Sequence, residues 1–375
     1  MPLPITDVFA DLPDPRRETS NKRHLLVDVL TLAVCAVIAG AETWDAIAEY
    51  GLTKEPFFRR FLQLPNGVPS PDTFARVFAR LDPKAFAERF GRWMAQACQA
   101  TGLIPIAIDG KSSRAARKAT ATGCLHTVSA WASQGRLTLG QVAVPDGSNE
   151  IAVIPDLLET LDLAGAIVTI DAAGCQKENA QLIREGGGHY LLCVKGNQPA
   201  LLQAVEAAFA GAEASGYEAV AFDHHAQSDD GHGRRETRSV AVIYDPEGLP
   251  EGWPDVKAVV EVVRQREASG VSTTTTHHYI SSRAGTALEM AERIRGHWGI
   301  ENNLHWVLDV VFHEDRSRIR EGHAGENLGL LRRVAVALLK RAPGKGTTPT
   351  KRLKAGWDDE FMLQVLQGIP AIIVR

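Results

Sequence analysis

Two apolar runs in the middle of the chain each end in an aspartate. Leu103 to Ile108 leads into Asp109, and Ala166 to Ile170 leads into Asp171. Apolar runs of this length, with polar or glycine residues at their ends, are typical of strands that are buried in a sheet. The pattern therefore predicts two core strands, each with an acid at its carboxyl end.

The segments around these strands complete an α/β pattern. Leu125 to Ala132 and Leu137 to Val144 predict an antiparallel hairpin around the turn Ser133-Gln134-Gly135. Helices are predicted at 151–161 and 177–184, and one more strand is predicted at 190–194. The order of strand, hairpin, helix, strand, helix and strand is that expected of an α/β fold with a ribonuclease-H-like mixed sheet.

Patterns outside this core predict further parts of the chain. Apolar residues recur at helical spacing before residue 100, which indicates a helical domain for either DNA binding or assembly. A helical pattern resumes at Leu288 and continues to about Leu308, despite the helix-weakening Gly296 and Gly299. We expect an N-terminal helical domain (1–100), the first part of the core (101–199), a β-rich insertion (200–284), the second part of the core (285–342) and a basic tail (343–375).

Length and composition limit the class of protein. The chain has 375 residues, enough for two or three units, and its five cysteines, without a CxxC pair, are typical of reduced thiols in a cytoplasm. Met1 to Arg17 lacks the basic and apolar stretches of an export signal. The most apolar segment, Val29 to Gly40, is too short to span a bilayer and predicts a buried helix. We therefore expect a cytoplasmic protein with no membrane partner.

Charge is unevenly distributed along the chain. The formal net charge of −4 at pH 7 argues weakly against nucleic-acid binding, yet residues 327–357 contain basic residues and no acid. A second basic cluster directly follows Asp109 and consists of Lys111, Arg114, Arg117 and Lys118. The run and the cluster could both neutralise phosphates, or they could simply form solvated surfaces.

Carboxylates at strand ends are suited to metal-dependent chemistry on phosphodiesters. Such cleavage can use two divalent ions about 3.5–4 Å apart without a protein nucleophile. Mg²⁺ prefers oxygen ligands, which carboxylates supply. Parallel neighbouring strands would bring Asp109 and Asp171 together, although a single acid after a strand is often only a turn residue.

A third carboxylate is expected from a helix that packs on the sheet. Glu301 has His297 four residues before it and His305 four residues after it, so the three side chains share one helix face. A surface ion pair with a histidine is the alternative interpretation of this spacing. Glu314 and Asp315 are competitors for the third position.

Several segments resemble the DDE transposases of bacterial insertion sequences, in the branch of the H-repeat-associated proteins. They are FADLPDPRR, SPDTFARVF, IAIDGK, TIDAAGCQKENA, LLCVKGNQ, HGRRETR and GHWGIENNLHWVLDVVFHED, and they run in order from about residue 7 to residue 340. The resemblance places the family's catalytic, metal-binding triad on Asp109, Asp171 and Glu301. It implies a ribonuclease-H-like core with a β-strand insertion before the catalytic helix, and two Mg²⁺ ions per site, or Mn²⁺ in their place.

The resemblance also implies an activity and partners. The expected enzyme cleaves the ends of its element and joins the freed 3′-hydroxyl to target DNA. Its partners are double-stranded DNA, as terminal inverted repeats and as target, and further copies of the chain in a homodimer or higher multimer. The alternatives are a nuclease of the same fold without strand transfer, and a catalytically inactive DNA-binding descendant of a transposase. Terminal inverted repeats beside the reading frame would favour the transposase over the nuclease.

Candidate DNA contacts come from the resemblance and from local charge. The resemblance favours a DNA-contacting hairpin in the insertion. A zinc site is the alternative for the histidines there, but no His pair has the spacing of structural zinc. The wider superfamily often places Tyr, Arg and Lys around its glutamate, where this chain has Ile294, His297 and Leu308. Other residues must therefore make those contacts. The candidates are Lys111, Arg114, Lys195, Arg234, Arg235, Arg238, Arg295, Asn302 and His305.

Overall fold

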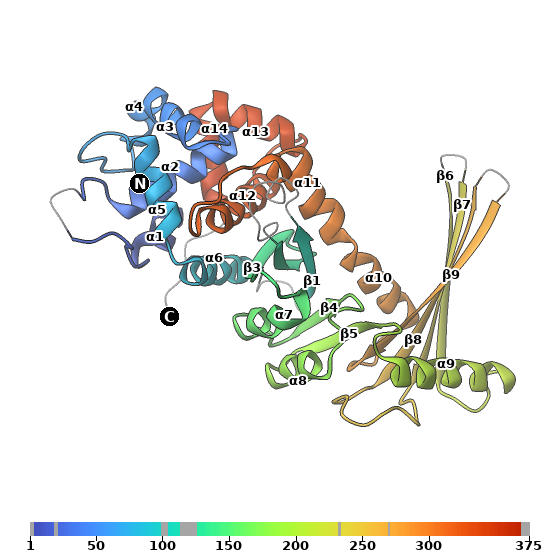
Figure 1. Cartoon of the computed structure of the whole chain (residues 1–375). Coiled ribbons are helices and arrows are strands. Elements are labelled where there is room, and N and C mark those ends of the chain that lie inside the picture. The colour runs from blue at the N-terminus through green and yellow to red at the C-terminus, as the bar shows by residue number, and fades with distance from the viewer. Residues whose placement is uncertain are drawn as a thin grey trace. The chain divides into compact units, whose positions relative to one another are not determined.

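A computed structural model describes residues 4–18, 22–98, 104–112, 126–231, 234–268 and 271–368 (Figure 1). Among the predicted DNA contacts, Arg114 lies outside these residues, and so does the side chain of Arg234. The chain forms two compact units. Unit 1 comprises Met1–Thr101, Gly110–Asn149 and Ile300–Arg375, and unit 2 comprises Gly102–Asp109 and Glu150–Gly299.

The strands of the described residues are β1 (Ile104–Ser112), β2 (His126–Ala132), β3 (Leu137–Val144), β4 (Ala166–Ile170), β5 (His189–Val194), β6 (Phe222–Gly231), β7 (Arg234–Tyr244), β8 (Ala258–Ala268) and β9 (Val271–Ser281). Their hydrogen-bonded order is β3-β2-β1-β4-β5-β9-β8-β7-β6. β1, β4 and β5 pair in parallel, and β2 and β3 form an antiparallel hairpin. The predicted ribonuclease-H-like mixed sheet is confirmed.

The parallel strands β4 and β5 of unit 2 are buried, because most of their residues are apolar. Every residue of β4 is buried, and so are the five residues of β5 that follow His189. Parallel strands require crossover connections, and the helices of those connections cover the sheet. Here the crossovers contain α7 (Glu150–Glu159) and α8 (Lys177–Glu185), which pack on each other.

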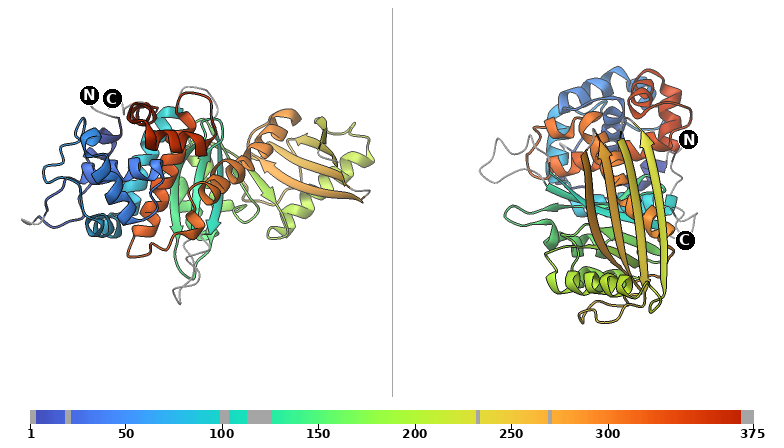
Figure 2. Two further views of the ribbon diagram at one scale, coloured as in Figure 1. Left: turned by 90° about the horizontal axis from the view of Figure 1, so that it is seen from above. Right: turned by 90° about the vertical axis from the view of Figure 1, so that its right-hand side faces the viewer.

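The β-rich segment of unit 2 continues the core sheet. β9 pairs antiparallel with β5, and beyond β9 the sheet continues with β8, β7 and β6 in that spatial order. Figure 2 shows these four long strands side by side. Residues 271–276 at the start of β9 are all exposed, so this end of the sheet projects beyond the helices that cover its base. The helix between β5 and β6 is α9 (Pro199–Ala214).

Helix α10 (Ala287–His297) packs across the strands of this segment. It begins with a capping box, in which Thr286 and Glu289 each satisfy a backbone amide of the other. Its residues Ala287 and Met290 join the apolar core that β7, β8 and β9 form with Val240, Val260 and Tyr279. One face of the sheet beneath α10 is therefore fixed by apolar packing.

Unit 1 contains the predicted N-terminal helices. Twelve of the fourteen residues of α2 are buried, which confirms the buried helix expected from its apolar run. Among the described residues, no single helix combines the length and apolarity needed to cross a bilayer. The helices α2 and α3 together have that length and composition, but the chain bends by 96° between them. The N-terminal helices are α1 (Pro4–Ala10), α2 (Leu26–Ala39), α3 (Trp44–Thr53), α4 (Glu55–Phe58), α5 (Pro71–Arg80) and α6 (Pro83–Cys98). α12 (Ala324–Arg341) packs against α2, α5 and α6.

The basic C-terminal run is partly a core feature of unit 1. Most of the tail folds into α13 (Thr348–Trp357) and α14 (Asp359–Gln367). Arg332 and Arg333 on α12 and Arg352 on α13 are buried, and the Arg352 guanidinium lies 4.3 Å from the centroid of the Phe312 ring. These three arginines correct the expectation that the whole run is free to meet phosphates or solvent, because their charges are enclosed by protein.

The contact between α6 and β3 makes a specific demand on the sequence. Gly91 is buried, and a Cβ atom at this position would lie 2.2 Å from the carbonyl oxygen of Leu139. We expect Gly91→Ala to lower the free energy of unfolding by about 1–3 kcal/mol, because the backbone must shift to relieve the overlap. Chemical denaturation measures the change.

A second glycine in a helix provides the control for this substitution. Gly211 on α9 is exposed, and a Cβ atom there would meet nothing within 4 Å. Gly211→Ala should therefore be neutral or raise stability by up to about 1 kcal/mol. Equal stability of the Gly91→Ala protein and the wild type would contradict the close packing of α6 on β3.

Candidate active site

The two aspartates meet through the register of β1 and β4. Ile108 of β1 lies opposite Ile170 of β4 in the parallel ladder. Asp109 and Asp171 each come next along their strands, at neighbouring backbone positions of strands that lie about 4.8 Å apart. Asp109 is partly buried and Asp171 is exposed. Unit 2 therefore presents a pair of adjacent carboxylates at the carboxyl end of its parallel strands.

The turn after β4 orients the Asp171 side chain. Its Oδ1 atom accepts hydrogen bonds from the backbone amides of Ala173, at 3.1 Å, and Gly174, at 3.3 Å. Asn197 stabilises the same turn through a 2.7 Å hydrogen bond from its Nδ2 to the carbonyl oxygen of Ala172. Hydrogen bonds from backbone amides restrict the rotation of this carboxylate.

His297 lies beside this turn, at the carboxyl end of α10. Its Nδ1 atom is 2.9 Å from Oγ1 of Thr169, which is buried and two residues before Asp171 on the same face of β4. Burial lowers the pKa of His297, and the negative charge of Asp171 opposes that shift. The imidazole is therefore neutral at physiological pH, with one ring nitrogen committed to Thr169.

Glu301 opens a π-helical turn in unit 1. The predicted long helix is interrupted here: α10 ends at His297, the π-helical turn spans Glu301–His305, and α11 (Trp306–Val310) follows. The Glu301 side chain is exposed. π-Helical turns inside helices occur often at functional sites, because the extra residue per turn displaces side chains from their regular positions.

The histidines that flank Glu301 in sequence have different surroundings. His297 belongs to unit 2, whereas His305 belongs to unit 1 and lies near Arg333 and Lys111. Burial, reinforced by these two cations, lowers the pKa of His305 to about 3. His305 is therefore uncharged near neutral pH and is unable to neutralise a phosphate.

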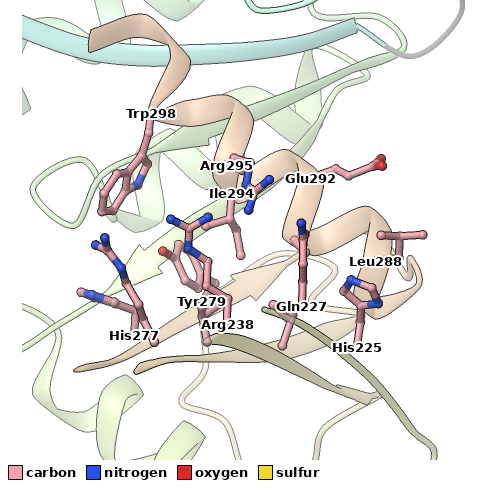
Figure 3. Close-up of a pocket in the computed structure, with 14 residues that line it drawn as sticks. His225, Gln227, Arg238, His277, Tyr279, Leu288, Glu292, Ile294, Arg295 and Trp298 are labelled. Carbon is pink, nitrogen blue, oxygen red and sulfur yellow. The ribbon is translucent and has the colours of Figure 1, made fainter. Parts of the chain in front are cut away.

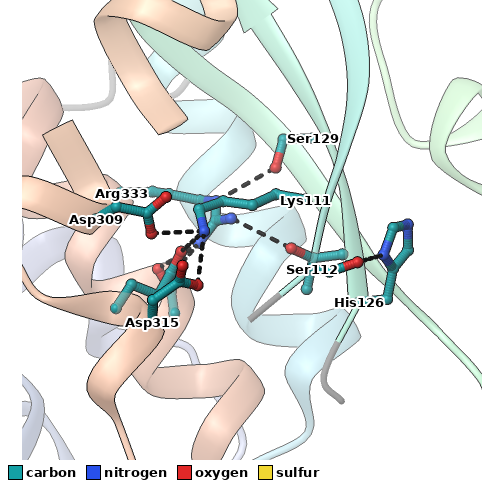
Figure 4. Close-up of polar contacts among 10 residues, drawn as sticks. Lys111, Ser112, His126, Ser129, Asp309, Asp315 and Arg333 are labelled. Carbon is teal, nitrogen blue, oxygen red and sulfur yellow. Dashed lines mark hydrogen bonds and ion pairs between the residues drawn. The ribbon is translucent and has the colours of Figure 1, made fainter. Parts of the chain in front are cut away.

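Both competitors for the third carboxylate position face cations in unit 1, and Figure 4 shows Asp315 beside Lys111. Glu314 is buried, and its Oε1 atom lies 3.0 Å from Arg333 Nη1. The Lys111 ammonium lies 3.3 Å from an oxygen of Asp315 and 3.8 Å from one of Glu314. The sequence suggested neither partner, because the paired residues are distant along the chain.

The other predicted DNA contacts of unit 2 are accessible in different degrees. Lys195, after β5, is exposed. Arg235 is exposed and lies 3.7 Å from Asp230, and Arg295 lies 3.4 Å from Asp229. Arg238 is partly buried and forms an ion pair with Glu236. In unit 1, Asn302 is exposed in the π-helical turn.

Two of these arginines, Arg238 and Arg295, line a cavity between α10 and the strands β6 to β9 (Figure 3). Its volume is about 220 Å³. Val240, Val262 and Tyr279 contribute apolar surface, and Arg238 and Arg295 contribute positive charge. A further arginine, Arg264, and the exposed Trp298 also line it, with the guanidinium 5.9 Å from the ring centroid.

Sequence reasoning missed Arg264 and Trp298 as members of this surface. Arg264 lies directly opposite Arg238 in the ladder of β7 and β8. The alternation of side chains along β8 was the sequence pattern that could have identified Arg264 as part of this surface. The zinc alternative is not supported by the strand geometry: His224 and His225 are neighbours on β6, so their side chains point to opposite faces of the sheet.

Comparison with known proteins gives matches along nearly the whole chain. The family model described as "Transposase DDE domain" matches residues 101–338, and the model "DDE_Tnp_1-associated" matches residues 6–94. A cryo-EM structure of the piggyBac transposase synaptic complex with hairpin DNA aligns with 100% of this chain and 79% of that chain. Its identity of 9% and TM-score of 0.39 are too low to bear on fold or partner.

Curated relatives are similar over the same length. The "H repeat-associated putative transposase YhhI" of Escherichia coli strain K12 is 38% identical, over 94% of this chain and 95% of the relative. The "Putative transposase YncI" of Escherichia coli O157:H7 is 39% identical, over 96% of this chain and 94% of the relative. The "Inactive transposase YbfQ" of strain K12 is 44% identical over 15% of this chain and 68% of the relative. The resemblance to the H-repeat-associated branch is thus confirmed, and the chain belongs to the family of transposases with a DDE domain.

Proposed function

We propose that this protein is a DNA transposase that cleaves the ends of its element and joins the freed 3′-hydroxyl to target DNA. Asp109, Asp171 and Glu301 are the proposed catalytic residues and metal ligands. The observation that carries the proposal is the register of β1 and β4, which puts Asp109 beside Asp171 in a family that generally uses divalent metal ions.

The donor set fits hard divalent cations. Carboxylate oxygens are the ligands that Mg²⁺ and Mn²⁺ prefer, and two Mg²⁺ ions, or Mn²⁺ in their place, are the proposed cofactor. When bound, such ions activate the attacking water or hydroxyl and stabilise the leaving oxygen. The chain's own contribution is to fix the ligands: the amides of Ala173 and Gly174 orient Asp171, and the bond between Thr169 and His297 anchors α10 beside it.

Glu301 is preferred to its competitors as the third acid. Glu314 and Asp315 already face the cations Arg333 and Lys111, and Glu314 is buried. The carboxylate of Glu301 is exposed, in a π-helical turn of the kind found at functional sites. Exposure leaves this carboxylate accessible to cations and to DNA.

The proposed DNA contacts are revised by burial and charge. Lys111 and His305 are omitted, because Lys111 is buried among carboxylates and His305 is neutral. Retained are the accessible polar and basic residues, to which Arg264 is added because it lines the same cavity as Arg238 and Arg295. They are Lys195, Arg235, Arg238, Arg264, Arg295 and Asn302. Arg114 and Arg234 remain predictions, because their side chains lie outside those that the structure describes.

The proposed DNA substrates are the terminal inverted repeats of the element and a target duplex. Two ends must be held together while both are processed. We therefore propose a homodimer or higher multimer on DNA as the active form, and a protein that acts in the cytoplasm and associates with the nucleoid when bound to DNA.

The catalytic assignment predicts the effect of a single substitution. Asp171→Asn should lower Mg²⁺-dependent cleavage of element-end DNA by at least about 10³-fold, because the ions contribute several kcal/mol of transition-state stabilisation. Glu301→Gln should have a similar effect, and chelation by EDTA should abolish cleavage by the wild type. The measurement is the rate of strand cleavage by purified protein on labelled end DNA.

Asp156→Asn is the matched control for this experiment. Asp156 is an exposed aspartate on α7 of the same unit, and its substitution should leave the cleavage rate unchanged. Cleavage by the Asp171→Asn protein at the wild-type rate would refute the assignment. Joining of the cleaved end to a target plasmid separates a transposase from a nuclease, and no cleavage by the wild type would favour an inactive descendant.

The cavity arginines predict a change in the salt dependence of DNA binding. Arg295→Ala should weaken binding to DNA of any sequence and reduce the slope of log K against log salt by about 1, because one phosphate contact is lost. Filter binding or fluorescence anisotropy at several salt concentrations measures the slope. Lys257→Ala is the control, since Lys257 is exposed and lies 3.5 Å from Asp245 away from the cavity lining. An unchanged slope for Arg295→Ala would argue against this surface as the DNA contact.

A further inference from the structure

Lys111 is a buried lysine among three carboxylates of unit 1 (Figure 4). Its Nζ atom lies 2.6 Å from Oδ1 of Asp309, 3.3 Å from Oδ1 of Asp315 and 3.8 Å from Oε2 of Glu314. Only 7% of its side chain is exposed. Lysine is rarely buried unless it is paired, so the three acids are what make this position possible.

Stability alone is a poor explanation for such a cluster. Removing two charges from water costs several kcal/mol per ion, and apolar residues of similar volume often replace a buried ion pair without loss. A buried pair nevertheless restricts distance, because the attraction offsets the loss of hydration only while the ammonium and the carboxylate stay in contact. The cluster therefore specifies the relative position of the segments that carry it.

The segments joined by Lys111 are those that follow two of the proposed catalytic acids. Lys111 is on β1, two residues after Asp109, and Asp309 is on α11, directly after the π-helical turn that begins at Glu301. A turn of 3₁₀-helix at Glu314–Arg316 follows and supplies the other two acids. The ammonium group of Lys111 thus links α11, which follows Glu301 in the chain, to the end of β1, which follows Asp109.

A second cation holds the far side of the cluster. Arg333 on α12 is 1% exposed and binds Glu314 at 3.0 Å. It also donates to Oγ of Ser129 and Oγ1 of Thr127, both on β2, at 3.2 Å each. Glu314 is therefore anchored by Arg333 as well as by Lys111, whereas Asp309 is the carboxylate that lies nearest to the lysine.

We propose that Lys111 is a positioning residue of the active site: through Asp309 and Asp315 it sets the position of Glu301 for metal binding. This inference rests on the proposed function, because it takes Glu301 as a metal ligand. Groups that orient metal ligands without touching the metal commonly change metal affinity by 10–100-fold when removed. Lys111 would act at the level of the backbone, by fixing the helix rather than the side chain.

The test removes the ion pair of Lys111 and Asp309, while Arg333 remains as the partner of Glu314. Lys111→Met together with Asp309→Asn should raise the Mn²⁺ concentration for half-saturation about 10-fold or more, measured by electron paramagnetic resonance of free Mn²⁺. The Mg²⁺ concentration for half-maximal cleavage of end DNA should rise in parallel, with the rate recovering at high Mg²⁺. Lys111→Arg, which keeps the charge, should stay within a few-fold of the wild type.

The control is the ion pair of Lys54 and Asp359, also in unit 1, at 2.7 Å. Lys54→Met with Asp359→Asn should leave both half-saturation values unchanged. Unchanged metal affinity in a folded Lys111→Met/Asp309→Asn protein would overturn the proposal and leave Lys111 a purely structural role. If that protein does not fold, the same metal affinities are measured on the Asp309→Asn protein, in which Lys111 still pairs with Asp315 and Glu314. Absence of metal-dependent cleavage in the wild type would instead count against the proposed function itself.

Discussion

Parallel hydrogen bonding between β1 and β4 is the constraint on which the candidate site depends. The ladder is in register at Ile108 and Ile170, and residues 106–108 of β1 and all of β4 are buried. A slip of one residue would turn every side chain of β4 to the opposite face of the sheet and would separate Asp171 from Asp109. The register therefore keeps Asp109 and Asp171 together.

The rest of unit 2 supports this pair from one side. The long strands β6 to β9 extend the sheet beyond β5, and α10 packs on them through apolar contacts. That packing carries His297 to Thr169, next to Asp171, and lines the cavity of Arg238, Arg264 and Arg295. The same helix thus connects the carboxylate end of the core to the positively charged surface proposed to hold DNA. In unit 1, the buried charges of Lys111 and Arg333 perform the corresponding task for the helix that follows Glu301.

The core could be predicted from the sequence because its signals are local. The apolar runs before Asp109 and Asp171 give the two strands, and the turn at residues 133–135 gives the hairpin of β2 and β3. The pairing of β9 with β5 could not be predicted, because β-pairing between segments so far apart leaves no trace in either pattern. The π-helical turn at Glu301 was also missed, since Gly296 and Gly299 weaken a helix without specifying how it is interrupted.

Charges were the least predictable part of the site. Lys111 stands in a basic cluster that suggests phosphate binding, yet its partners are carboxylates about 200 residues later in the chain. Arg332, Arg333 and Arg352 belong to an acid-free run and are nevertheless buried. A sequence gives the sign of each charge, but only the packing of distant segments determines whether a charge faces solvent, DNA or another side chain.

Asp109, Asp171 and Glu301 are proposed to hold the same pair of divalent ions. Anomalous X-ray diffraction from crystals of the protein with end DNA and Mn²⁺ would locate these ions directly. We expect two manganese peaks about 3.5–4 Å apart, with oxygens of all three carboxylates as ligands. Manganese bound by the two aspartates with Glu301 remote from both ions, or bound elsewhere altogether, would contradict this proposal.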